Sequence, residues 1–299
     1  MTLREKLGKI LNQSMLNQVI CSCDVVGDIA VIKIPVKIEH KADKIAEAVM
    51  QSNPHIKTVL QQTSPVEGEL RLRSLKWLAG ENKTETLHRE SGCIFKVDLE
   101  KCYFSPRLSF ERMRVAKQVM PSEVVVNMFT GVGCFSILIA KHSKPRKVYS
   151  IDINPDAIRY LNENIILNKA NYIVESIEGD AKEVILGKLQ NLADRVLMPL
   201  PEKAFEYLDY ALLALKTEGG KIHYYDFVYT EKGKDPIEEV QKKVSEKLRT
   251  INITFRFTFG RIVRTVGPRW YQVVLDIYIH KKDNRANQHF NNLTLLREA

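Results

Sequence analysis

The stretch VVVNMFTGVGCFSILIAKHSKPRKVYSIDINPD, residues 124–156, decides the fold. Its three consecutive β-branched residues, Val124–Val126, are typical of a strand that is buried on both faces. Gly131 and Gly133 follow, and they allow a sharp turn that brings the backbone close to a ligand. The apolar segment 135–140 then predicts a helix. The order of strand, glycine loop and helix predicts one unit of a doubly wound α/β sheet.

Asp152 lies just past the next strand, which we expect over residues 148–151. A carboxylate at this end of such a sheet can accept hydrogen bonds from both hydroxyls of a ribose, about 20 residues after the glycine loop. The loop lacks the third glycine of the dinucleotide fingerprint, because Ser136 stands in its place. This combination is typical of enzymes that use S-adenosylmethionine. The alternative is an α/β unit that binds no nucleotide and in which Asp152 only caps a helix.

The composition indicates a globular chain of 299 residues with a formal net charge of +9. No apolar run approaches the ~20 residues of a membrane span, and the first ten residues lack a signal-peptide core. The five cysteines form no CxxC pair, so we expect no metal site, no disulfide framework and a cytoplasmic location. The positive charge favours a polyanionic partner, although ordinary solubility charge explains it equally well.

The residues before position 102 predict a small α+β module that precedes the doubly wound sheet. We expect one kinked strand over residues 25–34, a helix over 38–49 and strands over 57–62, 84–88 and 93–97. The chain therefore divides into an N-terminal α+β domain of residues 1–102, a Rossmann-like domain of residues 103–280 and a polar C-terminal tail of residues 281–299.

Two charged segments of the chain stand out. Residues 69–76, ELRLRSLK, place Arg71 and Arg73 on one face if the stretch is extended. Residues 103–114, YFSPRLSFERMR, place Glu111 among basic and aromatic residues. Each segment is most simply a solvated face with salt bridges. Because Glu111 lies just upstream of the strand that opens the glycine loop, the chain could also bring it to the ligand crevice.

Further along the chain, acidic and proline residues follow the predicted strands. Asp180 comes after the third strand, where an acid commonly reaches an adenine amino group in such enzymes, and a helix N-cap is the alternative. Pro199 and Pro201 stiffen the turn after the fourth strand. Residues 253–263 and 271–280 predict a final antiparallel pair that closes the sheet, as in many methyltransferases.

Several segments together resemble one family, the archaeal and eukaryotic tRNA (guanine-N1)-methyltransferases, which act on the guanosine 3′ of the anticodon. The similarity runs from about residue 20 to about residue 280. The runs FSPR-x-x-x-ER and LAGE-x-K-T are far more specific than the glycine loop. The resemblance implies a Rossmann-like class I methyltransferase sheet with a smaller N-terminal α+β domain. Within that family, the chain resembles the form that lacks the extra N-terminal domain found in many archaeal relatives.

The resemblance also implies a cofactor, a partner and roles for individual residues. The cofactor would be S-adenosyl-L-methionine, and the partner would be the anticodon stem-loop of tRNA, bound by a monomer whose N-terminal domain supports RNA binding and catalysis. The family's general base falls on Glu111, and its catalytic arginine falls on Arg71. The positions around the target nucleotide fall on Tyr103, Arg107, Arg112 and Pro201, and those of the cofactor site on Phe129, Gly131, Gly133, Asp152, Ile153, Asp180 and Pro199.

This assignment gives a mechanism. Guanine N1 carries a proton at neutral pH, so a base must remove that proton as the new bond forms. Glu111 would be the base, and the Arg71 guanidinium would stabilise the negative charge that develops on O6. Two positions depart from the family pattern: Asn127 replaces the usual aspartate before the glycine loop, and Pro199 replaces the usual asparagine. The missing asparagine affects how the target base is oriented.

Three alternatives remain open from the sequence. The wybutosine-pathway aminocarboxypropyltransferases resemble this chain in its amino-terminal module and its sheet, and they transfer another arm of the same sulfonium. The L-P-E turn at residues 200–202 favours methyl transfer, because those transferases differ there. Enzymes that methylate exocyclic amines commonly carry an [N/D]-P-P-[YF] turn, and the turn at Pro199 lacks that aromatic residue. A non-catalytic RNA-binding protein with a relic cofactor site is the third.

Overall fold

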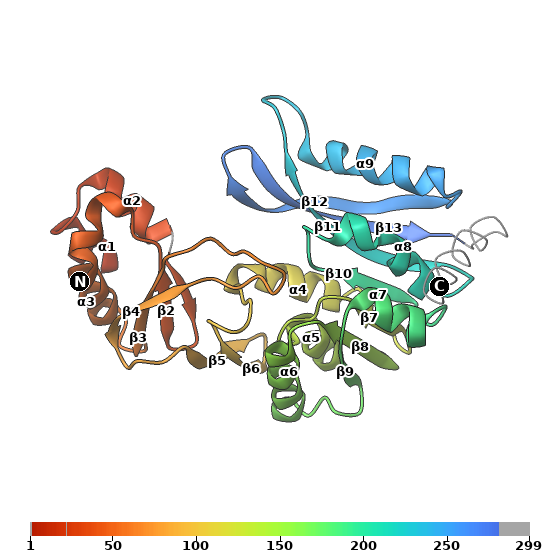
Figure 1. Cartoon of the computed structure of the whole chain (residues 1–299), viewed down its shortest axis with the longest axis horizontal. Helices are drawn as coiled ribbons and strands as arrows, with labels where there is room; N and C mark the ends of the chain where they lie inside the picture. The colour runs from red at the N-terminus through yellow and green to blue at the C-terminus, as the bar shows by residue number, and fades with distance from the viewer. Residues whose placement is uncertain (1, 22, 281–299) are drawn as a thin grey trace.

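The computed structural model describes residues 2–21 and 23–280, so the polar tail expected over residues 281–299 lies outside the described residues. The chain forms an elongated molecule with the N-terminal part at one end and a larger α/β part at the other (Figure 1). A small hairpin lies between the two parts (Figure 1).

The N-terminal part is a four-stranded sheet, in the order β1-β2-β3-β4, that shares a hydrophobic core with the helices that precede and interrupt it. Its elements are α1 (Leu3–Gly8), α2 (Gln13–Cys21), β1 (Asp24–Val26), β2 (Ile29–Ile32), η1 (Val36–Lys41), α3 (Ala42–Ser52), β3 (Thr58–Gln62) and β4 (Leu75–Gly80). The expectation of one strand over 25–34 is wrong. The chain reverses at Gly27, whose φ of 55° suits glycine, and β1 pairs antiparallel with β2.

The hairpin of β5 (Glu85–Glu90) and β6 (Cys93–Asp98) forms a sheet of its own. On one side it contacts the N-terminal sheet, because the Gly27 N–H donates to His88 Nδ1 at 3.2 Å and the Asp28 N–H donates to Thr86 Oγ1 at 3.2 Å. The approach is so close that a Cβ on Gly27 would lie 2.1 Å from Thr86 Oγ1. A glycine is therefore required where the two sheets meet.

On its other side the hairpin is bound to the larger part through asparagine side chains of α6 (Pro155–Leu167) and its end. Asn164 is fully buried, accepts the Lys96 N–H at 2.6 Å and donates to the carbonyls of Lys96 and Val132, each at 3.0 Å. Asn168 makes a similar pair of bonds to the backbone of Ile94. The division of the chain at residue 102 stays a prediction, and these contacts favour a boundary before the hairpin.

The larger part is built on a seven-stranded sheet in the order β12-β13-β11-β10-β7-β8-β9. The strands are β7 (Val124–Asn127), β8 (Lys147–Asp152), β9 (Val174–Glu178), β10 (Arg195–Met198), β11 (Gly220–Tyr229), β12 (Phe255–Gly267) and β13 (Trp270–Ile279). β7 to β11 run parallel, whereas β13 is antiparallel to both β11 and β12. The predicted Rossmann-like sheet and its antiparallel closing pair are confirmed.

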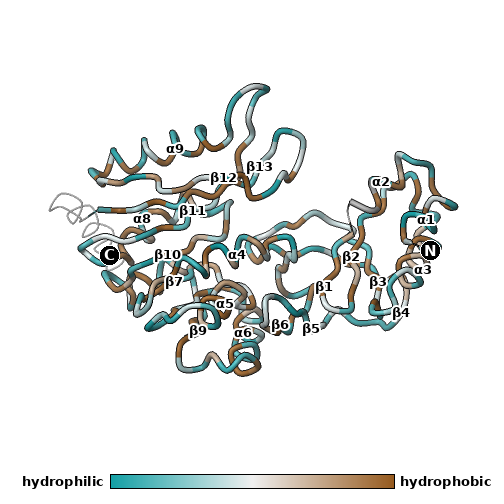
Figure 2. Tube along the Cα trace, turned by 180° about the vertical axis from the view of Figure 1, so that it is seen from behind, coloured by the Kyte–Doolittle hydropathy of each residue, from teal (hydrophilic) through white to brown (hydrophobic). Residues whose placement is uncertain are grey.

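Helices cover both faces of this sheet, and alternate strand residues separate two cores. Val125 packs in the core that α4, α5, α6 and the hairpin share, while its neighbour Val126 packs in the core formed with α7, η3, α8 and α9. Figure 2 shows hydrophobic segments concentrated along the central strands. Besides α6, the helices are η2 (Pro106–Leu108), α4 (Ser109–Ala116), α5 (Cys134–His142), α7 (Ala181–Val184), the π-helical η3 (Ile185–Leu189), α8 (Ala204–Ala214) and α9 (Pro236–Thr250).

We predict that Asn164→Ala lowers the free energy of unfolding by about 2 to 3 kcal/mol, because it leaves buried peptide groups of Lys96 and Val132 without a partner. Urea denaturation of the full chain measures this difference. Asn162→Ala, an exposed position on the same helix, is the matched control and should change the free energy by less than about 0.5 kcal/mol. Equal losses in the two variants would contradict the bridging role of Asn164.

Candidate active site

The glycine loop after β7 is held by backbone and side-chain hydrogen bonds. Gly131 has a φ of 55° and donates its N–H to Asp152 Oδ2 at 2.6 Å. Gly133 has a φ of 93°, and a Cβ there would lie 2.3 Å from Leu161 Cδ1. Ser136, in place of the third glycine, is fully buried and contacts Asn127 Nδ2 at 3.1 Å. The serine and the asparagine therefore fix the loop from beneath it.

A cavity opens at the carboxyl ends of β7 and β8, with an empty volume of about 1070 Å³ that includes its open mouth. Most of the predicted site residues line it: Arg71, Tyr103, Arg112, Phe129, Gly131, Asp152, Ile153, Asp180 and Pro199. Gly133, Arg107, Pro201 and Glu111 do not line it.

The two predicted acids lie on the wall of this cavity. Burial raises the pKa of Asp152, although hydrogen bonds from the N–H groups of Asn154 and Gly131 oppose that rise. Asp180 accepts the Tyr207 hydroxyl through both of its oxygens, at 3.0 and 2.9 Å. It also caps α7 by accepting the Lys182 N–H at 2.8 Å, so the N-cap interpretation holds while the residue still faces the cavity.

Arg71 enters the cavity from the N-terminal part of the chain. It does not lie in an extended stretch, which was the condition for Arg71 and Arg73 to share a face. It lies in a turn over residues 68–71 and has a φ of 55°. Its guanidinium carbon lies 4.4 Å from the centre of the Tyr103 ring, and Nη1 pairs with Glu202 at 3.1 Å. Its Nε is buried and has no hydrogen-bond partner among the residues that the structure describes. One donor of Arg71 is therefore uncommitted.

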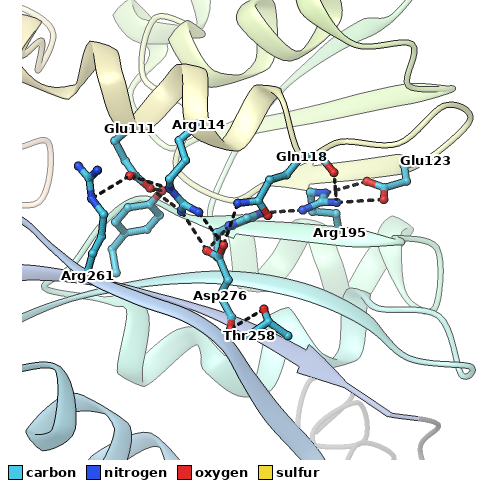
Figure 3. A network of polar contacts seen from close by, with 10 residues as sticks. Glu111, Arg114, Gln118, Glu123, Arg195, Thr258, Arg261 and Asp276 are labelled. Atoms are coloured by element: carbon cyan, nitrogen blue, oxygen red, sulfur yellow. Dashed lines mark hydrogen bonds and ion pairs between the residues drawn. The ribbon is translucent and has the colours of Figure 1, made fainter.

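Glu111 lies on α4 (Figure 3), and its side chain does not line the cavity. Its side chain is 1% exposed. Arg114 donates Nε and Nη2 to the two carboxylate oxygens at 3.0 and 2.8 Å, and the Tyr225 hydroxyl donates to Oε1 at 2.8 Å. Arg261 approaches from β12, with Nε 3.7 Å from Oε2. The structure therefore does not bring Glu111 and Arg71 together in the cavity.

The contacts of Glu111 continue into a buried polar network (Figure 3). Arg114 also binds Asp276, whose Oδ1 lies 2.7 Å from His223 Nδ1. The Nε2 of His223 accepts Arg195 Nη1 at 2.8 Å, so Nδ1 carries the proton and donates it to Asp276. Arg195 in turn pairs with Glu123. Burial would raise the pKa of Asp276, but the hydrogen bonds from His223 and Arg114 hold it well below its usual range.

Other predicted or possible site residues are committed to structural contacts. Arg112 is 3% exposed and pairs with Glu90 through Nε at 2.8 Å, although it borders the cavity. Arg107 pairs with Asp24 at 2.6 Å. Burial raises the pKa of the Cys134 thiol to about 12, so this cavity cysteine is no nucleophile. Within residues 2–21 and 23–280, no cluster of three or more His, Cys, Asp or Glu could hold a metal ion.

The structure adds three residues that the sequence reasoning missed. Leu70 lines the cavity beside Arg71, and Tyr207 lines it beside Asp180. Arg264, on β12, donates Nη2 to the Tyr103 hydroxyl at 3.1 Å. Leu70 lies within the charged segment already identified, so proximity to Arg71 was a usable signal. Tyr207 and Arg264 reach their partners across 27 and 161 residues, and no local pattern shows such contacts.

The comparisons with known proteins settle the family of this chain. The family described as "TRM5/TYW2 methyltransferase domain" matches residues 86–253, more than half of the chain. The chain belongs to the TRM5/TYW2 family. Residues 3–84 match a second family, which is described as "TYW2 N-terminal domain". The resemblance found in the sequence is confirmed, and the chain is a member of a family of tRNA-modifying methyltransferases.

Three members of this family show how far the similarity extends. The tRNA (guanine(37)-N(1))-methyltransferase Trm5b of Pyrococcus abyssi is 42% identical over 258 residues, covering 86% of this chain and 74% of that protein. The tRNA 4-demethylwyosine(37)-methyltransferase Taw21 of Saccharolobus solfataricus is 42% identical over 255 residues, covering 85% of this chain and 92% of that protein. The solved complex of aTrm5 and tRNALeu matches with a TM-score of 0.81 at 37% identity, covering 94% of this chain and 78% of that one.

Across the described ranges, none of the helices has the length and apolar character needed to cross a bilayer.

We predict that Asp276→Asn lowers the free energy of unfolding by about 1.5 to 3 kcal/mol at pH 7, because Arg114 and His223 lose a charged acceptor. The pKa of Asp276 is lowered in the folded state, so its stabilisation is complete above the ordinary aspartate pKa of 3.8 and is lost as the pH falls below that value. Urea titrations between pH 7 and about pH 2.5 should show the difference in the free energy of unfolding between wild type and variant shrinking below pH 3.8. Asp43→Asn, an exposed position on α3, is the control. A difference that stays constant with pH would contradict this account.

Proposed function

We propose that this chain methylates N1 of the guanosine that lies 3′ of the anticodon in tRNA, with S-adenosyl-L-methionine as the methyl donor. The observation that carries the proposal is that one cavity combines Asp152 and Asp180 with Arg71, which comes from the N-terminal part. The carboxylates of Asp152 and Asp180 can accept hydrogen bonds from the nucleoside of the cofactor. The guanidinium of Arg71 can stabilise negative charge that develops on the substrate. The named activity of the Pyrococcus abyssi relative supports the same reaction.

The residues of the cavity fit this cofactor. Each Asp152 oxygen accepts one backbone N–H and keeps a lone pair for a ribose hydroxyl. Gly131, whose backbone turns at the cavity, would hold the amino acid end of the cofactor, and Asp180 would hold its adenine end. When bound, S-adenosylmethionine supplies an activated methyl group on a sulfonium. The protein's contribution is then alignment of the acceptor and stabilisation of charge.

Arg71 stabilises the charge that develops on the base. Removal of the N1 proton moves negative charge onto guanine O6. The Nε of Arg71 is a buried donor without a partner among the described residues, and stacking on Tyr103 fixes its guanidinium. A fixed donor of this kind binds the charged transition state more strongly than the neutral ground state. Arg71 therefore lowers the barrier without assisting ground-state binding to the same extent.

Glu111 accepts the N1 proton as the bond from N1 to the methyl carbon forms and the bond from that carbon to sulfur breaks. Its carboxylate is held by Arg114 and Tyr225 in this structure, so RNA binding must turn it toward the cavity. Catalytic groups often reach working geometry only in the substrate complex. Asp276 already accepts hydrogen bonds from both terminal nitrogens of Arg114, so it still binds that guanidinium when Glu111 turns away.

One observation favours a second candidate, methylation of 4-demethylwyosine at the same tRNA position. Pro199 lines the cavity where the family usually carries asparagine, and a proline side chain offers no hydrogen bond to the polar edge of guanine. The Saccharolobus solfataricus relative is named for this reaction, and the alignment covers 92% of it. Aminocarboxypropyl transfer is the further alternative that remains from the sequence. A cytoplasmic, monomeric enzyme stays our expectation.

Nucleoside mass spectrometry tests these functions directly. An unmodified tRNA transcript with guanosine 3′ of the anticodon is incubated with the protein and S-adenosylmethionine, beside a tRNA that carries 4-demethylwyosine at that position. We expect one added methyl group on N1 of the guanosine. A methyl group only on the tricyclic base would move the assignment to the second candidate. A heavier aminocarboxypropyl adduct, or no product on either tRNA, would overturn methyl transfer.

We predict that Glu111→Gln lowers the single-turnover rate of methyl transfer about 100-fold or more at saturating tRNA and cofactor, because the proton acceptor is lost. Rapid-quench measurements with labelled S-adenosylmethionine give this rate. Tyr225→Phe is the control for damage to the network, because it removes one donor from the same carboxylate and keeps the base. Its rate should fall far less. Full activity of the Glu111→Gln variant would contradict the assignment of Glu111 as the general base.

A further inference from the structure

An exposed phenylalanine adjoins the proposed base. Phe110 precedes Glu111 on α4 and is 67% exposed. The guanidinium carbon of Arg261, from β12, lies 4.7 Å from the centre of its ring. A single exposed apolar residue is ordinary on a protein surface. A ring that is open to solvent, partnered by a cation and placed beside a catalytic carboxylate is a surface on which a nucleobase can stack.

Arg261 is only partly committed to protein contacts. Its Nε lies 3.7 Å from Glu111 Oε2, and this buried nitrogen makes no hydrogen bond to any residue that the structure describes. Figure 3 shows Arg261 rising from β12 to Glu111, at the opposite end of the network from Arg195 and Glu123. The side chain is 28% exposed, so its guanidinium is within reach of a ligand. Arg261 thus offers positive charge beside the open ring.

The same strand leads from this ring to the cavity. Arg264 follows Arg261 by three residues and contacts the Tyr103 hydroxyl at 3.1 Å and Ser105 Oγ at 3.4 Å. Tyr103 and Ser105 line the cavity. Residues 250–275 contain four arginines and no acidic residue. The surface formed by Phe110, Arg261 and Arg264, which we call the Phe110 patch, is therefore basic and aromatic, and through Arg264 it contacts two residues of the cavity wall. These are the properties of a surface that binds single-stranded RNA.

We propose that the Phe110 patch is the stacking site for a nucleotide of the anticodon loop that flanks the target guanosine. This inference rests on the proposed function, since it takes a tRNA as the substrate. The flanking base stacks on the open part of the Phe110 ring, and Arg261 and Arg264 face its phosphates. Holding the neighbouring nucleotide outside the cavity favours the unstacked position of the target base, which enzymes acting on bases require.

A fluorescent base placed next to the target tests the proposal. 2-Aminopurine is introduced on the 5′ side of the target in one tRNA and on the 3′ side in another, and its emission is followed during binding. We expect wild-type protein to quench one of the two positions. Phe110→Ala should abolish that quench and weaken tRNA binding roughly tenfold, the loss expected for one stacked base. The Phe110→Trp variant should keep both the fluorescence quench and the affinity for tRNA.

The controls separate this inference from the proposed function. Tyr172→Ala removes another exposed aromatic residue, 87% exposed in the turn between α6 and β9, and should behave as wild type. Affinity for S-adenosylmethionine should be unchanged in every variant. If wild-type protein methylates the tRNA but Phe110→Ala binds it with the quench and affinity intact, the stacking site is wrong. If wild-type protein makes no methylated product, the proposed function fails, whatever the fluorescence shows.

Discussion

The hairpin of β5 and β6 is the constraint on which the candidate site depends, because it joins the two parts of the molecule. Partly buried hydrogen bonds hold it on both sides: Gly27 and Asp28 bind it to the N-terminal sheet, and Asn164 binds it to the α/β part. If one of these hydrogen bonds were lost, the free energy cost of the unpaired peptide group would exceed the stabilisation that an ordinary surface contact provides. The hairpin therefore sets the position of the N-terminal part relative to the glycine loop, and with it the position of Arg71.

This arrangement divides the chemistry between the two parts of the chain. The α/β part supplies the ligand cavity at the switch point of its sheet, where β7 lies between β8 and β10. The N-terminal part supplies the guanidinium of Arg71. The backbone of this residue lies in the left-handed region of φ, which a residue other than glycine adopts at an energetic cost. Stacking on Tyr103 and the ion pair with Glu202 stabilise that turn.

Local sequence patterns predicted the elements whose shape depends on neighbouring residues. Val124–Val126, the glycine loop and Asp152 lie within one short stretch, and the structure places them as expected. The turn at Arg71 and the reversal at Gly27 were not predicted. Both depend on contacts with distant segments, namely Tyr103 for the first and Thr86 for the second. The charge pattern of a short segment does not show which distant side chain will contact that segment and fix its conformation.

The surroundings of Glu111 were beyond prediction for the same reason. Its motif placed it near the site, but its partner Tyr225 lies 114 residues away, and Asp276, which shares Arg114 with it, lies still further along the chain. These residues sit on strands β11 and β13, whose pairing brings them under α4. Ser136 shows the converse case. A residue that breaks a familiar glycine pattern proved to be a buried anchor of the same loop.

The central claim is that the N-terminal part delivers a transition-state donor to a cofactor cavity built by the α/β part. The most direct measurement is the single-turnover rate of methyl transfer in Arg71→Ala, taken together with the dissociation constants for S-adenosylmethionine and tRNA. Arg73→Ala, which removes a guanidinium two residues away, serves as the comparison. The account predicts a rate about 100- to 1000-fold below wild type, with nearly unchanged cofactor affinity and little effect in Arg73→Ala. An unchanged rate, or a loss that lies wholly in cofactor affinity, would contradict it.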